Sequence, residues 1–175
     1  MERVVSSVAE EEPARRRRSV PAWRAAGLDG DRLFDKPEHW LDKSAMNPQL
    51  EKLKFDANGL IPIIVQDVQN GQVLMMAYMN REALEKTLAT GKIHTYSRSR
   101  GRLALKGESS AHFQHVKELR TDCDRDVVLF KVVQDVAACH EGYRSCFFRQ
   151  YDANGNDWKI VEERAFDPDA VYQKK

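Results

Sequence analysis

Two apolar runs near the middle of the chain predict a β-hairpin. The first, GLIPIIVQDV (59–68), is rich in β-branched residues, and the second, VLMMAYMN (73–80), follows it closely. Between them lies the pair Asn70-Gly71. Because both of these residues tolerate positive φ, such a pair between two apolar runs is typical of a hairpin turn.

A helix is predicted directly after the hairpin. Asn80 can cap the segment REALEKTLATG, Leu84 and Leu88 lie four residues apart on one face, and Gly91 can end it. The pattern then returns to strands. The further strand candidates are KIHTYSRS, RLALKG, HFQHVKELRTDCD, DVVLFKVVQDV and SCFFRQYD, with WKIVEERAF a last strand or a helix. The expected fold class is α+β, a mostly antiparallel β-sheet with few helices.

Composition divides the chain into three parts. Residues 1–47 contain three prolines, a four-arginine run and little apolar period, which predicts a poorly ordered N-terminal extension. The arginine run is either solvated, next to the acidic stretch that precedes it, or a patch for a partner. Residues 48–152 are expected to form the folded domain, and residues 153–175 a C-terminal tail that packs on it or beside it.

Charge and apolar content exclude several partner classes. Lys and Arg together number 28, against 27 Asp and Glu, so nothing indicates a general attraction to nucleic acid or membranes. No apolar run approaches the roughly 20 residues of a membrane helix, and the N-terminus has no apolar signal core. We therefore expect a cytoplasmic protein. Three cysteines without an export signal argue against a disulfide framework.

The stretch TDCDRDVV combines a thiol with three carboxylates. If it forms a strand, Asp122, Asp124 and Asp126 share one face with successive Cα atoms about 6.5–7 Å apart, and Cys123 points the other way. Like charges on one face repel, and a divalent cation removes that repulsion. Oxygen ligands select Mg²⁺ or Ca²⁺, whereas thiolate selects Zn²⁺. The alternative is a solvated acidic turn.

The stretch CHEGYRSC supplies two further thiols. Cys139 and Cys146 with Cys123 make three ligands, and water in the fourth position completes the arrangement of a catalytic zinc. If the aspartates face their own site, Cys123 faces away from it, so Cys139 and Cys146 can come from a second copy. This predicts a homodimer with metals at the subunit interface. The alternative is a pair of buried core thiols.

A basic stretch, SRSRGRLALKGESSAH (97–112), precedes these motifs. Arginines among hydroxyls and backbone N–H groups suit a phosphate group, and a basic surface hairpin is the alternative.

Taken in order, the motifs resemble those of the phosphoribosyl-AMP cyclohydrolase family, the third enzyme of histidine biosynthesis. The matching pieces are GLIPIIVQD, VLMMAYMNREAL, SRSRGRL, KGESSAH, DCDRD and CHEGYRSCFFR. The resemblance covers about half of the chain and makes residues 48–152 a cyclohydrolase-like catalytic domain. It implies a homodimer, Mg²⁺ on Asp122, Asp124 and Asp126, and Zn²⁺ on Cys123, Cys139 and Cys146, shared between subunits.

The resemblance also implies a reaction. The substrate is 1-(5-phosphoribosyl)-AMP, whose N1–C6 bond is hydrolysed to give the formimino-aminoimidazole-carboxamide ribotide. Zinc lowers the pKa of its bound water to about 7, and the resulting hydroxide would attack C6. His140, beside Cys139, is the first candidate for proton transfer, and His112 is the second. The substrate-contact candidates are Ser97, Arg98, Ser99, Arg100, Lys106, Glu108 and Ser109.

Two differences from the family's usual sequence leave an alternative function open. Ala104 stands where the family usually has Trp, and Ala111 where it usually has Gly. A paralogous zinc hydrolase acting on a related purine nucleotide is therefore the second reading. A zinc nucleobase deaminase is disfavoured, because its His-x-Glu and Pro-Cys-x-x-Cys pattern is missing. A non-enzymatic zinc-stabilised module would need a closed four-ligand zinc.

Overall fold

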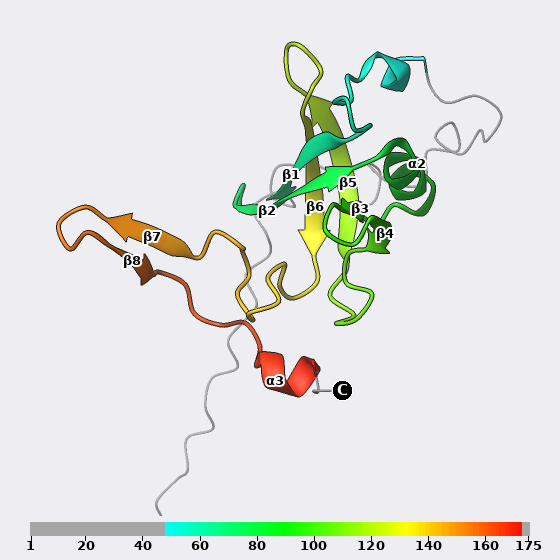
Figure 1. Cartoon of the computed structure of the whole chain (residues 1–175). Coiled ribbons are helices and arrows are strands. Elements are labelled where there is room, and N and C mark those ends of the chain that lie inside the picture. The colour runs from blue at the N-terminus through cyan, green and yellow to red at the C-terminus, as the bar shows by residue number, and fades with distance from the viewer. Residues whose placement is uncertain (1–47, 173–175) are drawn as a thin grey trace, which may run out of the picture.

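The computed structural model describes residues 48–172, and its centre is a four-stranded sheet (Figure 1). In spatial order the strands are β2 (Val73–Met79), β1 (Ile61–Asp67), β6 (Val128–Gln134) and β5 (Gln114–Thr121). Two of the three pairings are antiparallel, and the central pair β1–β6 is parallel. This confirms the expected mostly antiparallel α+β class. The expectation for residues 1–47 lies outside the described residues.

The first hairpin forms where the apolar runs predicted it. β1 and β2 pair antiparallel, with a register shift between Val65 and Gln66. The connection is longer than a two-residue turn, because the backbone N–H of Asp67 donates to the carbonyl of Gln72 at 2.8 Å. Inside it, the N–H of Gly71 donates to the carbonyl of Asp67 at 3.0 Å.

Helix α2 (Arg81–Thr90) also begins and ends as predicted. The side chain of Asn80 accepts a hydrogen bond from the N–H of Ala83 at 2.8 Å, and Gly91 ends the helix with φ +67°. Leu84 is fully buried, and Leu88 packs partly buried against the same core. That core joins α2 to the apolar side chains of β1, β2 and β6.

Two ribbons and two short helical segments complete the described chain. β3 (His94–Ser97) pairs with β4 (Arg102–Leu105), and β7 (Arg149–Asp152) pairs with β8 (Asp157–Ile160). The 3₁₀ turn η2 (Leu50–Lys52) precedes β1, and α3 (Pro168–Val171) comes last. The expected boundary between residues 152 and 153 falls at the end of β7, so the β7–β8 hairpin continues across it. Within residues 48–172, no helix is long and apolar enough to cross a membrane.

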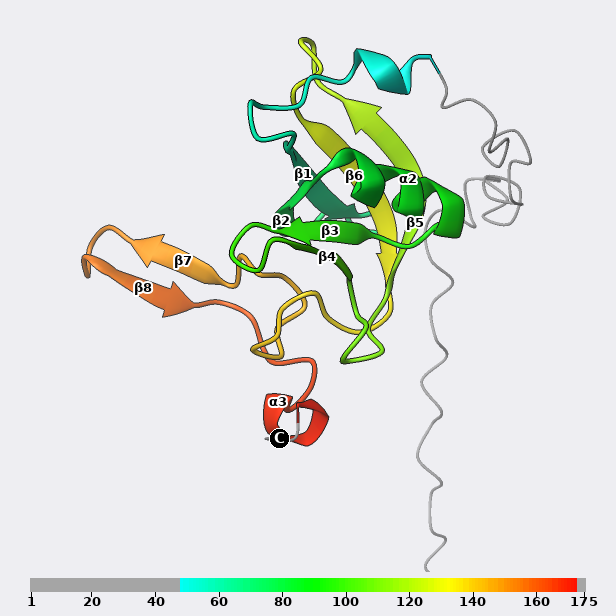
Figure 2. The same cartoon turned by 45° about the vertical axis from the view of Figure 1, so that its right-hand side comes forward.

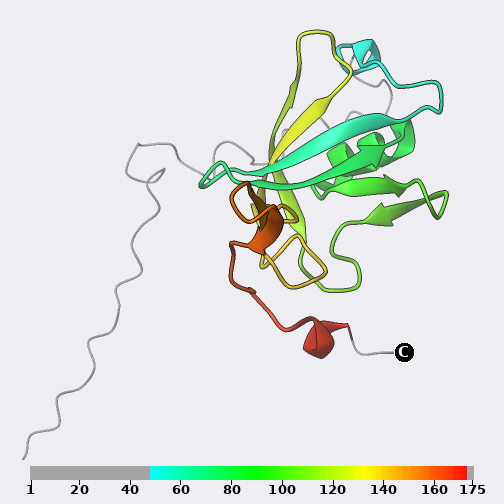
Figure 3. The same cartoon turned by 60° about the vertical axis from the view of Figure 1, so that its left-hand side comes forward.

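The motif-bearing loops lie at opposite ends of the sheet. The acidic stretch connects β5 to β6, whereas the segment that carries Cys139 and Cys146 follows β6. Figures 1, 2 and 3 all show these two connections at opposite ends of β6. The seven residues of β6 span about 23 Å. One chain therefore presents its carboxylates and its thiol pair to different regions of space.

Candidate functional site

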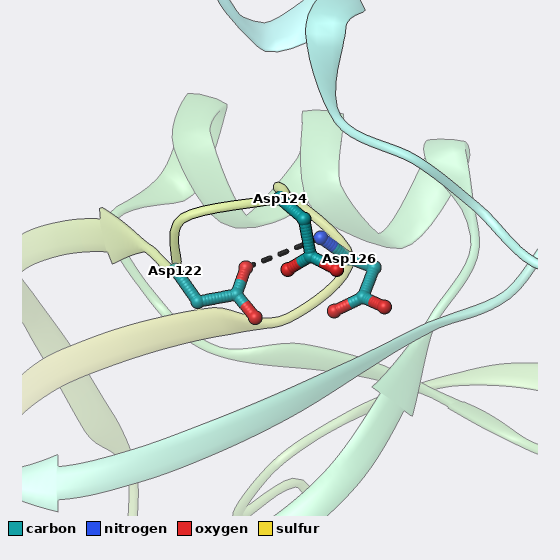
Figure 4. Close-up of side chains that lie close together, drawn as sticks. All are labelled: Asp122, Asp124 and Asp126. Carbon is teal, nitrogen blue, oxygen red and sulfur yellow. Dashed lines mark hydrogen bonds between the residues drawn. The ribbon is translucent and has the colours of Figure 1, made fainter.

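The three aspartates lie in a loop, not in a strand. β5 ends at Thr121 and β6 begins at Val128, so the expected strand alternation of Asp122, Asp124 and Asp126 is wrong. The loop nevertheless brings one carboxylate oxygen of each residue within 4.8 Å of the others (Figure 4). Alternation would have held their Cα atoms about 6.5–7 Å apart, so the loop assembles a tighter oxygen cluster than a strand could.

Hydrogen bonds inside the loop fix Asp122. Its Oδ1 accepts from the backbone N–H of Asp126 at 3.2 Å and from that of Val127 at 3.3 Å. Thr121 Oγ1 donates to the carbonyl of Val127 at 2.9 Å, which closes the loop at its base. Arg125 takes a positive φ of 64°, and its carbonyl accepts from the N–H of Lys54 at 2.8 Å. The loop is therefore shaped by its own backbone and by the chain before β1.

The carboxylates perturb one another electrostatically. Desolvation and then the charges of Asp124 and Asp122 raise the pKa of Asp126. Desolvation also acts on Asp122, but hydrogen bonds, chiefly from the N–H of Val127, outweigh it and lower its pKa. This is the behaviour of like charges held together, and a hard divalent cation is the ligand that such an oxygen set fits.

The loop that carries the other two thiols is anchored through Arg144. One Nη of Arg144 forms an ion pair with the fully buried carboxylate of Asp67 at the end of β1. The other Nη donates to the carbonyl of Val136 at 3.2 Å. If the loop moved away from the sheet, the buried carboxylate of Asp67 would lose its ion pair, which is energetically costly. The contact therefore holds the loop against the sheet.

The two residues after Arg144 attach the loop to strand β2. Ser145 Oγ donates to the carbonyl of Val73 at 2.7 Å and accepts from the N–H of Phe147 at 2.9 Å. The N–H of Cys146 donates to the carbonyl of Leu74 at 2.7 Å. The Arg-Ser-Cys sequence therefore consists of two anchoring residues followed by the thiol that they position.

The loop places Cys139 and Cys146 beside each other and beside Lys106. Cys146 is exposed at the surface, but desolvation by the surrounding protein raises the pKa of its thiol to about 11; the neighbouring Cys139 acts in the same direction while Lys106 opposes it. Burial lowers the pKa of Lys106, and the two thiols act against that shift. Lys106 Nζ donates to the carbonyl of Ala138 at 2.5 Å. A cation bound to both thiols would therefore lie next to an ammonium group.

Cys123 is the thiol that does not join this pair within one chain. It is exposed in the acidic loop, before β6, whereas Cys139 is buried after β6. Among residues 48–172, the aspartates are the only three metal-ligating side chains whose ligand atoms gather within 4.8 Å of one another. Within one chain the described residues therefore do not assemble a three-thiol site.

Both candidate histidines lie at the thiol end of the sheet. His140 is exposed in the loop between Cys139 and Cys146. His112 has a buried Nδ1 atom without a hydrogen-bond partner, and its ring meets Phe166 edge-on at 4.7 Å. A buried ring nitrogen without a partner is uncommon, and a substrate atom or a water would satisfy it.

Phe166 ends the segment WKIVEERAF, for which the sequence predicted a strand or a helix. Strand β8 takes only its beginning, up to Ile160, and sequence reasoning gave the rest no role at the site. We call residues 164–166 the strap. The N–H of Ala165 donates to the carbonyl of Gly142 at 2.7 Å. Arg164 forms an isolated antiparallel β-bridge with Tyr143. A Cβ on Gly142 would lie 2.4 Å from the carbonyl oxygen of Phe166. The strap therefore closes tightly over the thiol loop while its aromatic ring contacts His112.

The expected substrate stretch divides into two groups. The Ser97–Arg100 group forms the β3–β4 turn, where Arg98 lies 3.9 Å from the ring centroid of Tyr78. Tyr78 pairs with Pro62, next to the start of the β1–β6 pairing, so this group lies at the acidic end of the sheet. Lys106 lies at the thiol end, and the exposed Glu108 and Ser109 follow it in the chain.

Ala111 adopts a backbone conformation that suits glycine. Its φ is +57°, in the left-handed region that is unfavourable for residues with a Cβ. The resemblance led us to expect Gly at this position, and Gly would adopt this φ without strain. The substitution strains the backbone one residue before His112.

Comparison with known proteins decides the family. The sequence model described as phosphoribosyl-AMP cyclohydrolase matches residues 75–148. The phosphoribosyl-AMP cyclohydrolase of Methanococcoides burtonii is 54% identical over 123 residues, which are 70% of this chain and 98% of that protein. The protein of the same name from Pelotomaculum thermopropionicum is 56% identical over 126 residues, 72% of this chain and 97% of that protein.

The chain belongs to the phosphoribosyl-AMP cyclohydrolase family. A histidine biosynthesis bifunctional protein of Thermoanaerobacter pseudethanolicus is also 51% identical over 124 residues, 71% of this chain and 56% of that protein. Membership confirms the resemblance drawn from the motifs. All of the candidate ligands, histidines and substrate contacts lie inside the segment that the cyclohydrolase family model matches, whereas the strap lies beyond it.

Proposed function

We propose that this chain hydrolyses the N1–C6 bond of the adenine ring in 1-(5-phosphoribosyl)-AMP, giving the formimino-aminoimidazole-carboxamide ribotide in the cytoplasm. Family membership with relatives of that name supports the reaction. The observation that carries the proposal is the meeting of Cys139, Cys146 and Lys106 at one end of the sheet. A thiol pair next to an ammonium group is suited to holding a metal near an anionic nucleotide.

The proposed enzyme takes two metals. Mg²⁺ would be held by Asp122, Asp124 and Asp126, whose oxygen set fits a hard cation. Zn²⁺ would be held by Cys139 and Cys146 together with the partner subunit's Cys123. The separation of the two loops along β6 supports this sharing, because a single chain does not bring the three thiols together. The working unit proposed is therefore a homodimer.

The residues around the thiols would divide the remaining work. When bound, zinc would activate a water at neutral pH and polarise the bond to be attacked. Lys106 would hold an anionic substrate group beside the thiols. His140, exposed next to Cys139, would transfer a proton to or from the substrate, and His112 would accept or donate a hydrogen bond through its unpartnered Nδ1.

Sharing between subunits also explains the divided substrate stretch. In a dimer with the partner subunit's Cys123 at the zinc, the acidic loop of one copy meets the thiol loop of the other. The β3–β4 turn that carries Arg98 lies at the same end of the sheet as the acidic loop. It would then approach Lys106 of the other copy. Mg²⁺ and these basic groups would together neutralise the substrate phosphates.

The test is turnover of phosphoribosyl-AMP by the purified chain with Zn²⁺ and Mg²⁺. We expect turnover by the parent and none by Cys139→Ser. His140→Ala and His112→Ala should lower kcat, whereas His115→Ala should not. His115 is a suitable control because its Nε2 is already paired with Asp135 on the surface.

Each contrary outcome has a defined meaning. A folded, zinc-loaded parent without turnover would refute the proposed substrate. Hydrolysis of a related purine nucleotide by that protein would instead favour the paralogous hydrolase, for which Ala104 and Ala111 are the motivation. Unchanged kcat in either histidine variant would remove that histidine from the mechanism.

A further inference from the structure

The ring of His112 is held differently from the rings of His94 and His115. Those two histidines each have a ring nitrogen within 3.0 Å of a protein oxygen. The Nδ1 atom of His112 is buried and has no hydrogen-bond partner within residues 48–172. The neighbour of this ring is the aromatic side chain of Phe166 in the strap. The orientation of His112 therefore depends on an apolar contact.

The backbone of His112 is fixed beside Lys106. The segment between these residues folds back so closely that a Cβ on Gly107 would lie 2.4 Å from the carbonyl oxygen of His112. The N–H of His112 also donates to Ser110 Oγ at 3.3 Å. Gly107 directly follows Lys106, whose ammonium group lies near the two thiols, so His112 belongs to the same end of the sheet. A fixed backbone still leaves the side-chain torsions free, so the ring needs a contact of its own.

Phe166 supplies this contact and is itself attached to the loop that carries the thiols. The N–H groups of Ala165 and Phe166 both donate to the carbonyl of Gly142, at 2.7 and 3.4 Å. Just before the strap, a carboxylate oxygen of Glu162 accepts from the N–H of Ser145 in the same loop at 3.4 Å. The strap therefore holds the ring of Phe166 in a defined place relative to the thiol loop.

An apolar ring is suited to orient a histidine whose nitrogens are needed elsewhere. The ring centroids of Phe166 and His112 lie 4.7 Å apart with the planes at 72°, the edge-to-face arrangement that aromatic pairs prefer. A carboxylate at this place would occupy a ring nitrogen, as Asp135 does for His115. The phenyl ring restricts the imidazole and leaves both nitrogens available for hydrogen bonds.

We propose that Phe166 is a positioning residue, which holds the ring of His112 in the orientation in which Nδ1 hydrogen-bonds the bound nucleotide. The inference rests on the proposed function, which gives His112 its role, and it adds a residue outside the segment that the family model matches. A freely rotating ring would present Nδ1 in the productive direction only part of the time. Because orientation matters most as charge moves in the transition state, its loss should lower kcat and leave KM nearly unchanged.

The kinetic test compares Phe166→Ala with Glu163→Ala, a control at an exposed position of the same segment. Turnover of phosphoribosyl-AMP is measured with the full-length protein in the presence of Zn²⁺ and Mg²⁺. We expect Phe166→Ala to lower kcat at least about tenfold and to change KM less than about twofold, while the control matches the parent. If Phe166→Ala does not fold, Phe166→Leu keeps the apolar bulk without the ring, and it should lower kcat at least about threefold.

A double variant distinguishes positioning from a general structural role. In a His112→Ala background there is no imidazole left to orient, so adding Phe166→Ala should lower kcat by less than about twofold. An equal loss of kcat in the two backgrounds would overturn the inference, because Phe166 would then act through something other than His112.

A spectroscopic measurement needs no turnover. In protein labelled with ¹³C-histidine, relaxation of the ring C–H groups gives an order parameter for His112, whose signals are assigned by their loss in His112→Ala. We expect this order parameter to fall from about 0.85 in the parent to below about 0.6 in Phe166→Ala, and to stay unchanged in Glu163→Ala. An order parameter that Phe166→Ala leaves unchanged would overturn the inference.

The two measurements also separate this inference from the proposed function. Turnover by the parent with unchanged kcat in Phe166→Ala would refute the positioning role and leave the proposed function standing. A parent that does not hydrolyse phosphoribosyl-AMP would refute the proposed substrate, while the order parameter would still decide whether Phe166 holds the ring of His112.

Discussion

Replacing Gly142 with alanine is expected to destabilise the protein through the strap. Gly142 lies in the thiol loop with φ +94°, and a Cβ there would sit 2.4 Å from the carbonyl oxygen of Phe166. That separation is far below any normal contact with a backbone atom, so either the loop or the strap must move. Movement of the strap breaks the hydrogen bonds that Ala165 and Phe166 donate to the carbonyl of Gly142, at 2.7 and 3.4 Å.

The magnitude follows from these two contributions. A residue with a Cβ in such a strained backbone conformation costs about 1–3 kcal/mol. Each lost hydrogen bond adds about 1 kcal/mol. We therefore expect Gly142→Ala to lower the free energy of unfolding by about 3–5 kcal/mol, which for a protein of this size lowers Tm by about 10–15 °C.

Gly91→Ala is the matched control. Gly91 also has a positive φ, +67°, but a Cβ on it would meet no atom within 4 Å. Its replacement should therefore lower the free energy of unfolding by only about 1–2 kcal/mol, the backbone contribution alone. Urea unfolding of both variants and the parent, at one protein concentration, compares the three free energies.

A truncated chain separates the strap from the backbone strain. In a protein that ends at Glu163, the strap is gone, and Gly142→Ala should cost no more than Gly91→Ala. The coupling between truncation and substitution is then read from a double-mutant cycle. Equal costs for Gly142→Ala and Gly91→Ala in the full-length chain would refute the reasoning, because they would show that the strap contact contributes nothing.

Three further predictions follow from the site. Ala111→Gly relieves a φ of +57° and should raise the free energy of unfolding by about 1 kcal/mol in a urea titration; a decrease would show that the strain is absent. Arg144→Ala leaves the buried Asp67 carboxylate unpaired and should lower that free energy by about 3 kcal/mol, whereas adding Asp67→Ala should cause little further loss. Asp124→Asn should weaken Mg²⁺ binding at least tenfold by calorimetry without lowering Tm of the metal-free protein, and unchanged affinity would exclude the aspartate cluster as the Mg²⁺ site.

Local structure was largely predictable because its causes lie close together in the sequence. The apolar runs around Asn70-Gly71 formed the β1–β2 hairpin, and the caps at Asn80 and Gly91 bounded α2. Both depend on backbone preferences and on hydrophobic period over a few residues. The family could also be recognised, because the order of short motifs is a property of the sequence alone.

The acidic motif shows where local periodicity misled. An alternating Asp-Cys-Asp pattern predicts a strand, but like charges and the positive φ of Arg125 favour a loop. Only the loop, with its bonds to Asp122 Oδ1, brings the carboxylate oxygens within 4.8 Å. The residue types in the cluster were evident from the sequence, but its geometry was not.

The tertiary structure alone decided which groups meet. Asp67 pairs with Arg144 and Phe166 packs on His112, although each pair is separated by more than 50 positions. The parallel β1–β6 pairing places the thiol loop against the end of β1 and the acidic loop about 23 Å away. The sequence by itself determined which donor types the chain offers, carboxylates and thiols, because donor type is a property of each residue. The strand order decided which donors lie at which end of the sheet. That order arises from long-range packing, which a short sequence pattern does not reveal.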